Sequence, residues 1–154
     1  MRAMAIRQVD ASPSGASALI HLEDDNGDHL ATVPVDDATG QAILATLIGR
    51  PSAHAAAFDA LEAALQVFGG YASCVVIAER HGRLCGTLQI NARFRSTTLE
   101  LPAAQALLAA TRLHLPILMH ECDIASHTVR ADVPPVFRTL LASLDLSGLE
   151  SEGH

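Results

Sequence analysis

The sequence has few aromatic residues and no lysine, and each shortage excludes a class of protein. Its 154 residues include four Phe, one Tyr and no Trp, whereas proteins that stack bases or sugars on several rings need more rings than this. The ten basic residues are all Arg, and seventeen acids give a net charge of −7. Because this charge repels nucleic acid backbones and anionic membrane surfaces, a simple DNA-binding module and a membrane-surface protein are disfavoured.

Long hydrophobic runs are absent as well. No segment approaches about 18 consecutive apolar residues, and residues 1–10 lack the apolar core of a signal peptide. We therefore expect a cytoplasmic protein with no membrane partner. Hydrophobic residues make up 49 % of the chain and charged residues 18 %, which excludes a chain that is as a whole a disordered tail or a solvating linker. The length suits one domain, which we place at residues 1–146, followed by a flexible tail at 147–154.

Cysteine is scarce, and its placement argues against a disulfide or a metal site. Cys74, Cys85 and Cys122 do not have metal-ligand spacing. A hairpin turn at His81-Gly82 would put Cys74 about four positions, or roughly 13 Å, from Cys85, which is too far for a disulfide. We predict three free, buried thiols.

One short segment collects several potential metal ligands. It contains His120, Glu121, Cys122, Asp123 and His127. A zinc site needs ligands that converge from separate elements, and eight histidines in 154 residues will form one local cluster by chance. We therefore interpret this group as accidental.

Turn residues and apolar spacing divide the chain into alternating strands and helices. Asn26-Gly27 is typical of a tight hairpin, Asp37 or Thr39 can cap a helix, and Gly49 can end it. The predicted strands are 1–9, 17–22, 29–35, 73–79, 84–91, 93–100 and 115–119, and the predicted helices are 38–49, 53–68, 102–113 and 135–145. This order predicts an α+β fold with a mixed or antiparallel sheet rather than a doubly wound parallel sheet.

Two helical segments resemble each other. Residues 40–46 (GQAILAT) and 104–110 (AQALLAA) are identical at four of seven positions, and each follows a predicted strand. The match indicates a duplicated strand-helix core, although alanine-rich helices also match by chance.

Four segments, in order and at similar spacing, resemble the bifunctional nuclease domain family. Residues 50–61 (RPSAHAAAFDAL) are similar to its Arg-Pro-x-Thr-His-Asp-Leu segment, and residues 101–109 (LPAAQALLA) to its Arg-Pro-Ser-Asp-Ala-Ile-Ala-Leu-Ala segment. Val33-Pro34-Val35 resembles its Leu-Pro-Ile strand, and Leu115-Pro116-Ile117 resembles its closing Thr-Pro-Ile. The resemblance covers about residues 5–145 and implies an α+β fold with a duplicated core, oligomer formation, and cleavage of DNA or RNA.

The polar residues of that family carry over unevenly. Its Arg, Pro and His fall on Arg50, Pro51 and His54, whereas the Asp after the His is Ala55 here. The remaining positions also differ: the Glu of its first helix falls near Thr39 or Gly40, the Asp of its Pro-Ser-Asp segment falls at Gln105 or Ala104, and the Arg before that proline is Leu101. Thr, Ala and Gln cannot supply the carboxylates that hold Mg²⁺ or Mn²⁺.

Two hypotheses follow from the resemblance. The first is a nuclease that uses a divalent metal, Mg²⁺ or Mn²⁺, with His54 and Arg50 as catalytic residues helped by the nearby acids Asp37 or Glu100, and Asp36 as a further substitute. The second, which the lost acids and the charge of −7 favour, is a catalytically inactive relative that acts as a dimeric binding or scaffolding domain. Under the second hypothesis His54 only caps or packs at a helix start.

Arginines mark a candidate phosphate-binding surface. Arg93 and Arg95 alternate on one predicted strand, and Arg80 and Arg83 lie at the neighbouring turn. Together they would form a basic patch that can meet phosphate, or an ordinary exposed strand face with ion pairs. Binding of nucleic acid is otherwise implied by the family resemblance alone.

Overall fold

The computed structural model describes residues 1–11 and 15–127. The predicted helix at 135–145, the predicted tail at 147–154 and the domain boundary at 146 lie outside these residues. In chain order the described elements are β1 (Arg2–Ala11), β2 (Ser17–Asp24), β3 (Leu30–Asp36), α1 (Asp37–Leu47), α2 (Ala53–Val67), β4 (Gly70–Arg80), β5 (Arg83–Ala92), β6 (Arg95–Pro102), α3 (Ala103–Leu113), β7 (Ile117–Met119) and α4 (Glu121–His127).

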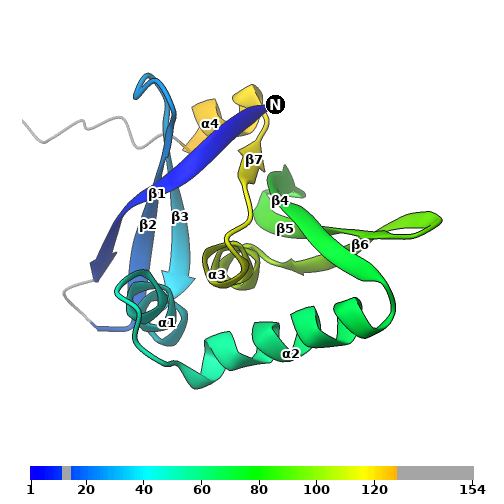
Figure 1. Ribbon diagram of the computed structural model, residues 1–154. Helices are drawn as coiled ribbons and strands as arrows, with labels where there is room; N and C mark the ends of the chain where they lie inside the picture. Colours follow the sequence, from blue (N-terminus) through cyan, green and yellow to red (C-terminus); the bar gives the residue numbers. More distant parts are fainter. Residues whose placement is uncertain (12–14, 128–154) are drawn as a thin grey trace, which may run out of the picture.

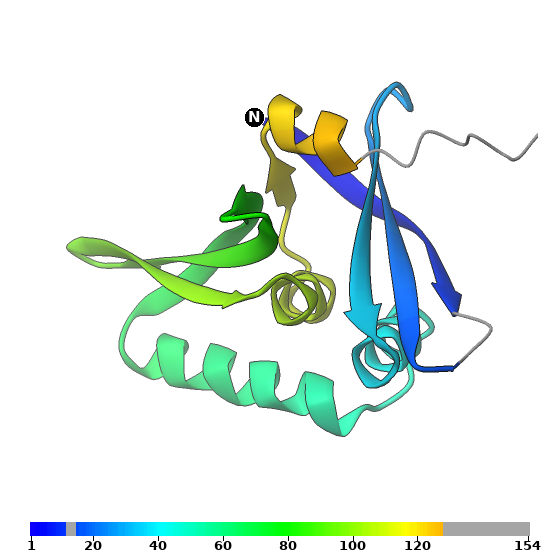
Figure 2. The same ribbon diagram turned by 180° about the vertical axis from the view of Figure 1, so that it is seen from behind.

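The seven described strands form one mixed sheet in an α+β fold. Their order is β3-β2-β1-β7-β4-β5-β6. β4 and β7 pair in parallel, whereas the other neighbours pair antiparallel. The sheet is strongly curled, with α3 inside the curl and α2 running across its open side (Figure 1; Figure 2 gives the view from behind).

The elements on the two sides of β7 follow the same order. β1, β2 and β3 form an antiparallel meander that leads into α1, and β4, β5 and β6 form a second meander that leads into α3. The first strand of each meander pairs with β7, and the third strand lies at an edge of the sheet. The three-residue strand β7 therefore joins the two meanders into a single sheet.

Alanine allows α3 to approach the sheet closely. Its inward side is built from Ala103, Ala106, Ala109 and Ala110 with Leu107 and Leu108, all of which are buried. A methyl group built on Gly86 of β5 would lie 2.1 Å from the Cβ of Ala106. Only glycine at position 86 therefore permits this separation of strand and helix.

The predicted hairpin register between β4 and β5 is confirmed. Ala78 pairs with Cys85, and Cys74 pairs with Gln89, so the two cysteines lie apart along the hairpin. His81 and Gly82 form the turn with positive φ angles of 53° and 73°, as a two-residue hairpin requires. All three cysteines are free. The prediction that all three are buried is wrong, because Cys122 is exposed and the other two are half-buried.

Two local predictions about helices need correction. α1 is capped by Asp36, not by Asp37 or Thr39. The seven-residue helix α4 was not predicted, because its residues were interpreted only as potential ligands. In the described part of the chain, helices are too short or too polar to cross a bilayer.

Candidate functional site

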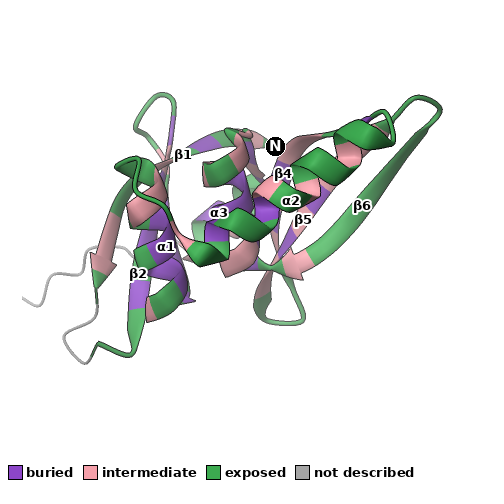
Figure 3. Cartoon of the chain, turned by 60° about the horizontal axis from the view of Figure 1, so that its bottom comes forward, coloured by how far each residue is buried: buried purple, intermediate pink, exposed green. Residues whose placement is uncertain are grey.

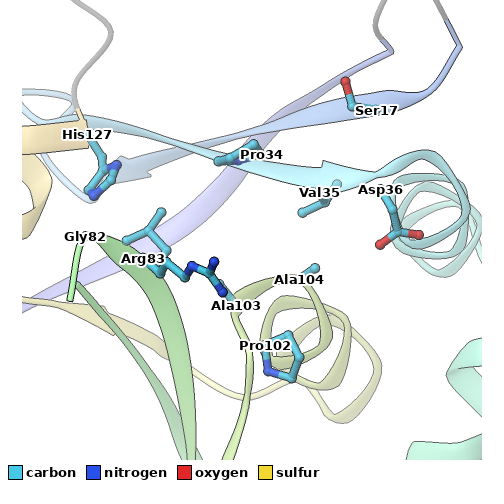
Figure 4. A pocket seen from close by; sticks show the side chains of 11 residues that line it. Ser17, Pro34, Val35, Asp36, Gly82, Arg83, Pro102, Ala103, Ala104 and His127 are labelled. Carbon is cyan, nitrogen blue, oxygen red and sulfur yellow. The ribbon is translucent and has the colours of Figure 1, made fainter. Parts of the chain in front are cut away.

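A cleft of about 540 Å³ lies where the two meanders and their helices meet. Its lining comes from the starts of β2 and α3, the ends of β3 and β6, the β4–β5 turn with the start of β5, and the end of α4. Apolar groups form most of the wall, namely Pro34, Val35, Leu84, Pro102, Ala103 and Ala104. In Figure 4, His127 and Asp36 lie at opposite ends of the cleft, with Arg83 between them.

Asp36 brings a carboxylate to the cleft, and both of its oxygens are engaged. The Thr39 amide donates to one oxygen at 2.9 Å, and the Thr39 hydroxyl donates to the other at 2.6 Å. The Thr39 hydroxyl contributes most to lowering the pKa of Asp36, followed by the Thr39 amide, and the charge of His54 adds a smaller effect. Asp36 is therefore ionised at neutral pH, but it serves as the N-cap of α1.

His54 and Arg50, the leading catalytic candidates, are not among the residues that line the cleft. His54 is in the first turn of α2, and its side chain is exposed. It is close enough to Asp36 for its charge to act on that carboxyl. Arg50 is exposed in the connection between α1 and α2, where its amide donates to the carbonyl of Ala45 at 2.7 Å. The structure thus brings His54 and Asp36 into one region.

Glu100 faces another part of the molecule. It is opposite Thr87 in the sheet, whereas its neighbour Leu101 is opposite Gly86, the residue that touches α3. Since side chains alternate along a strand, Glu100 points away from α3. Its carboxylate forms an ion pair with Arg80 at 2.5 Å. This contact ties Glu100 to the end of β4.

Asp37 is half-buried in the first turn of α1. A carboxylate at this position stabilises a helix by opposing its dipole. Asp37 and Glu100 were the acids expected to help catalysis. Each of them therefore has a structural role, and neither position requires a catalytic one.

The acidic side chains do not fit a divalent metal. Asp36 is held by Thr39 and Glu100 by Arg80, so neither offers a free pair of oxygens toward the other. Among residues 1–11 and 15–127, there is no group of three His, Cys, Asp or Glu side chains that could hold a metal ion. The acid of the family's Pro-Ser-Asp segment was expected at Gln105 or Ala104; Ala104 lines the cleft, Gln105 does not, and neither carries a carboxylate. No catalytic step through a metal can be derived from this arrangement.

The cleft does present positive charge. Arg83 extends its guanidinium toward the start of α3 (Figure 4). The first turn of α3 has no side-chain cap, because Pro102 is at the N-cap position, and its free amides carry a partial positive charge. The arrangement can hold a small ligand that combines an apolar part with an anionic group.

His127, one of the potential metal ligands at residues 120–127, is engaged by a residue of β4. His127 contacts the carboxylate of Glu79 at 2.9 Å, and Ser126 donates to the same carboxylate oxygen at 3.3 Å. Cys122 is exposed on the same helix. These contacts attach the end of α4 to β4 and place His127 at the rim of the cleft.

The four arginines do not form a single patch. Arg80 and Arg83 flank the β4–β5 turn, whereas Arg93 and Arg95 flank the β5–β6 turn at the other end of β5. The ten residues of β5 separate the two turns by roughly 30 Å at the usual strand rise. Sequence reasoning therefore missed the position of Arg83 in the lining of the cleft, since only the tertiary fold brings it close to α3.

Comparison of the chain with models of protein families gives no match, and comparison with curated proteins gives none either.

Proposed function

We propose that this chain is a divergent bifunctional nuclease domain-like protein with a duplicated core. The repeated order of meander and helix on the two sides of β7 supports the duplication. The contacts of the helices support it further: α1 meets the middle strand β2 through Gly40 and Ala18, and α3 meets the middle strand β5 through Ala106 and Gly86. The segments that resemble the family lie on β3, α2, α3 and β7.

The function that this geometry supports best is non-catalytic binding of a small anionic ligand in the cleft. The observation that carries the proposal is the state of Asp36, the carboxylate among the described residues that line the cleft: Thr39 holds both of its oxygens, and the two positions expected for a further acid are Gln105 and Ala104. A hydrolytic nuclease needs carboxylates that bind metal. A cleft lined by apolar groups with Arg83 near an uncapped helix start is suited to binding instead.

A nuclease remains the second candidate, because His54 lies near Asp36. A histidine beside an ionised carboxylate is a common general base. In this alternative Asp36 would have to release Thr39 in order to bind Mg²⁺ or Mn²⁺, and Asp37 would have to turn toward it. Arg50 would then contact the phosphate.

Cleavage of single-stranded DNA and RNA separates the two candidates. The purified chain is assayed with Mg²⁺, with Mn²⁺ and with a chelator, beside His54→Ala prepared in the same way. We expect no metal-dependent cleavage above that of His54→Ala. Metal-dependent cleavage that disappears in His54→Ala would overturn the non-catalytic proposal and establish the nuclease.

Binding in the cleft is tested by thermal unfolding with inorganic phosphate and with a nucleoside monophosphate as probes. A probe at ten times its dissociation constant stabilises the folded chain by about 1.4 kcal/mol. We expect Arg83→Ala to reduce this stabilisation, whereas Arg7→Ala, whose side chain pairs with Glu23, leaves it unchanged. Equal stabilisation of both variants by every probe would show that the cleft is not the anion site.

A further inference from the structure

We propose that a second pocket, between the ends of α1 and α3, binds a small organic cation that carries an ammonium group on a compact apolar body. The pocket has a volume of about 260 Å³ and is lined by β1, the last turns of α1 and α3, His114 and the start of β7. We call it the helix-end pocket. Among the described residues, none lines both this pocket and the cleft. The inference therefore goes beyond the proposed function and does not rest on it.

The two helices that form the pocket point in the same direction. α1 and α3 pack side by side (Figures 1 and 2), and their starts lie at the cleft, where Asp36 precedes α1 and Ala103 begins α3. Their last turns lie at the helix-end pocket, which Thr46 and Thr111 line. The backbone dipoles of both helices therefore place partial negative charge at this pocket. Such a field favours a cation.

The threonine hydroxyls of the pocket are free only as acceptors. The Thr46 hydroxyl donates to the carbonyl of Ala42 at 2.8 Å, and the Thr111 hydroxyl donates to the carbonyl of Leu107, also at 2.8 Å. Because each hydroxyl has one hydrogen, its oxygen can then only accept a further hydrogen bond. An ammonium group has three donor hydrogens and no acceptor, so it matches these oxygens.

His114 adds a third acceptor. It ends α3 in the left-handed conformation, with φ of 53° and ψ of 44°, whereas the left-handed residues that follow α1 and α2 are Gly49 and Gly69. A side chain in this conformation carries a steric cost that glycine avoids. The imidazole lines the pocket and makes no hydrogen bond to another residue in the described part of the chain. A neutral imidazole has one acceptor nitrogen, which can receive another hydrogen of the ammonium group.

The remaining lining is apolar and limits the size of the ligand. Ala110 and Ile117 are buried, Ile6 is half-buried and Leu47 is exposed. An apolar cavity of about 150 Å³ can bind benzene, so a pocket of about 260 Å³ can hold a body of that size together with an ammonium group. Residues 48–51, which follow α1, are exposed (Figure 3), and the pocket is open to solvent on this side.

Positive side chains near the pocket are directed elsewhere. Arg112, in the last turn of α3, donates two hydrogen bonds to Asp59 of α2, at 2.6 and 2.8 Å. Arg7 of β1 pairs with Glu23, and neither Arg7, Arg50 nor Arg112 lines the pocket. The net charge of −7 also attracts cations. An anion would meet the negative helix ends and hydroxyl oxygens that have no hydrogen to offer.

Chemical-shift titration of the ¹⁵N-labelled chain with benzylammonium, benzyl alcohol and benzoate tests the proposal, because these probes differ mainly in charge. Titrations at about pH 8 keep ordinary imidazole groups neutral. We expect benzylammonium to bind with a dissociation constant of about 1 mM or below and to shift the amide signals of Thr46, Thr111 and His114. Benzyl alcohol should bind about tenfold more weakly, because it lacks the charge-assisted hydrogen bonds, and benzoate should bind more weakly still. Shifts of Arg83 and Ala104 report binding of benzoate in the cleft and are counted separately.

A fourth probe, n-butylammonium, distinguishes two sources of the same chemistry. It has the stem and charge of a lysine side chain. Tighter binding of benzylammonium would identify a free amine as the ligand, whereas tighter binding of n-butylammonium would identify a lysine side chain of a partner. Both results support an ammonium site.

Variants test which side chains hold the cation. His114→Gly removes the imidazole at a position that glycine favours, so the chain should keep its thermal stability while the dissociation constant of benzylammonium rises about tenfold. The matched control is His81→Gly, which makes the same exchange at another histidine with a φ angle of 53°, outside the pocket, and should leave binding unchanged. Thr46→Val together with Thr111→Val keeps the side-chain shape, removes both acceptors and should also weaken binding about tenfold or more.

Three results overturn the proposal. The first is the absence of shifts at Thr46, Thr111 and His114 with benzylammonium at about ten times the expected dissociation constant. The second is binding of benzoate in the helix-end pocket as tight as that of benzylammonium. The third is an unchanged affinity for benzylammonium in both His114→Gly and the double valine variant. The cleft is tested with anionic probes and Arg83→Ala, so failure of one proposal leaves the other unaffected.

Discussion

Replacement of Gly86 by alanine is expected to destabilise the fold strongly, because β5 and α3 are in contact at this residue. The added methyl group would lie 2.1 Å from the Cβ of Ala106, whereas carbon atoms in van der Waals contact are about 3.5–4.0 Å apart. The Cβ of Ala106 is fixed to the helix backbone, so no rotamer change can relieve the overlap. Strand and helix must separate by roughly 1.5 Å or the two elements must distort.

The magnitude follows from the cost of overpacking. Extra methyl groups forced into a packed core cost about 1–3 kcal/mol, and we expect Gly86→Ala to reach about 3 kcal/mol at the upper end of that range. Ala106→Gly alone should cost about 1 kcal/mol, the helix-propensity difference between the two residues. In the double variant the clash is absent, so its loss should be about 2 kcal/mol smaller than the sum of the single losses.

Urea unfolding followed by circular dichroism measures these differences. The double-mutant cycle isolates the contact from any effect of alanine on the unfolded chain. The reasoning is refuted if Gly86→Ala lies within about 0.5 kcal/mol of the wild type. It is equally refuted if the losses of the two single variants simply add.

Two further predictions concern carboxylates whose pKa values the fold lowers. Asp36→Ala removes the N-cap of α1 and should cost about 1 kcal/mol in urea unfolding, whereas Asp36→Asn, which can still cap, should cost less; equal losses would contradict the capping role. The hydrogen bond from Arg112, and then its charge, lower the pKa of Asp59. The carboxylate therefore stabilises the fold above its unfolded pKa of about 3.9, and this contribution is lost as the pH falls through the lower folded value. Thermal unfolding from pH 6 to about pH 2 should show a smaller acid loss for Asp59→Asn than for the wild type, and identical pH profiles would contradict it.

Local signals in the sequence predicted the described elements well. His81-Gly82 adopts the two-residue hairpin turn that its residue types favour, and positive φ angles at Gly49 and Gly69 end α1 and α2. These features depend on steric preferences of a few neighbouring residues, so they can be read without the fold. The tight hairpin predicted at Asn26-Gly27 is wrong in its length, because residues 25–29 connect β2 to β3 and only Gly27 of the pair has a positive φ angle. The N-cap at Asp36 was missed by one residue, since boundaries depend on which competing cap the tertiary fold selects.

The candidate site was predicted less well, because it depends on which face of a strand each side chain occupies. His54 and Glu100 were expected to act together, but the register of β6 turns Glu100 toward Arg80. A shift of one residue would have reversed that face. Arg83 was grouped with the arginines of the neighbouring strand, and its position beside α3 follows from the β4–β5 turn meeting the start of that helix.

The sequence by itself determined the α+β class, the order and approximate limits of the strands and helices up to Met119, and the wide separation of Cys74 from Cys85. Only the tertiary structure decided that β7 joins two meanders and that α3 lies inside the curled sheet. It also decided that the aromatic side chains of Phe68, Tyr71 and Phe94 remain exposed. The physical reason is the range of the interactions. Turns and helical periodicity are set by contacts within a few residues, whereas sheet order and burial are set by pairings between distant segments whose free energies act together.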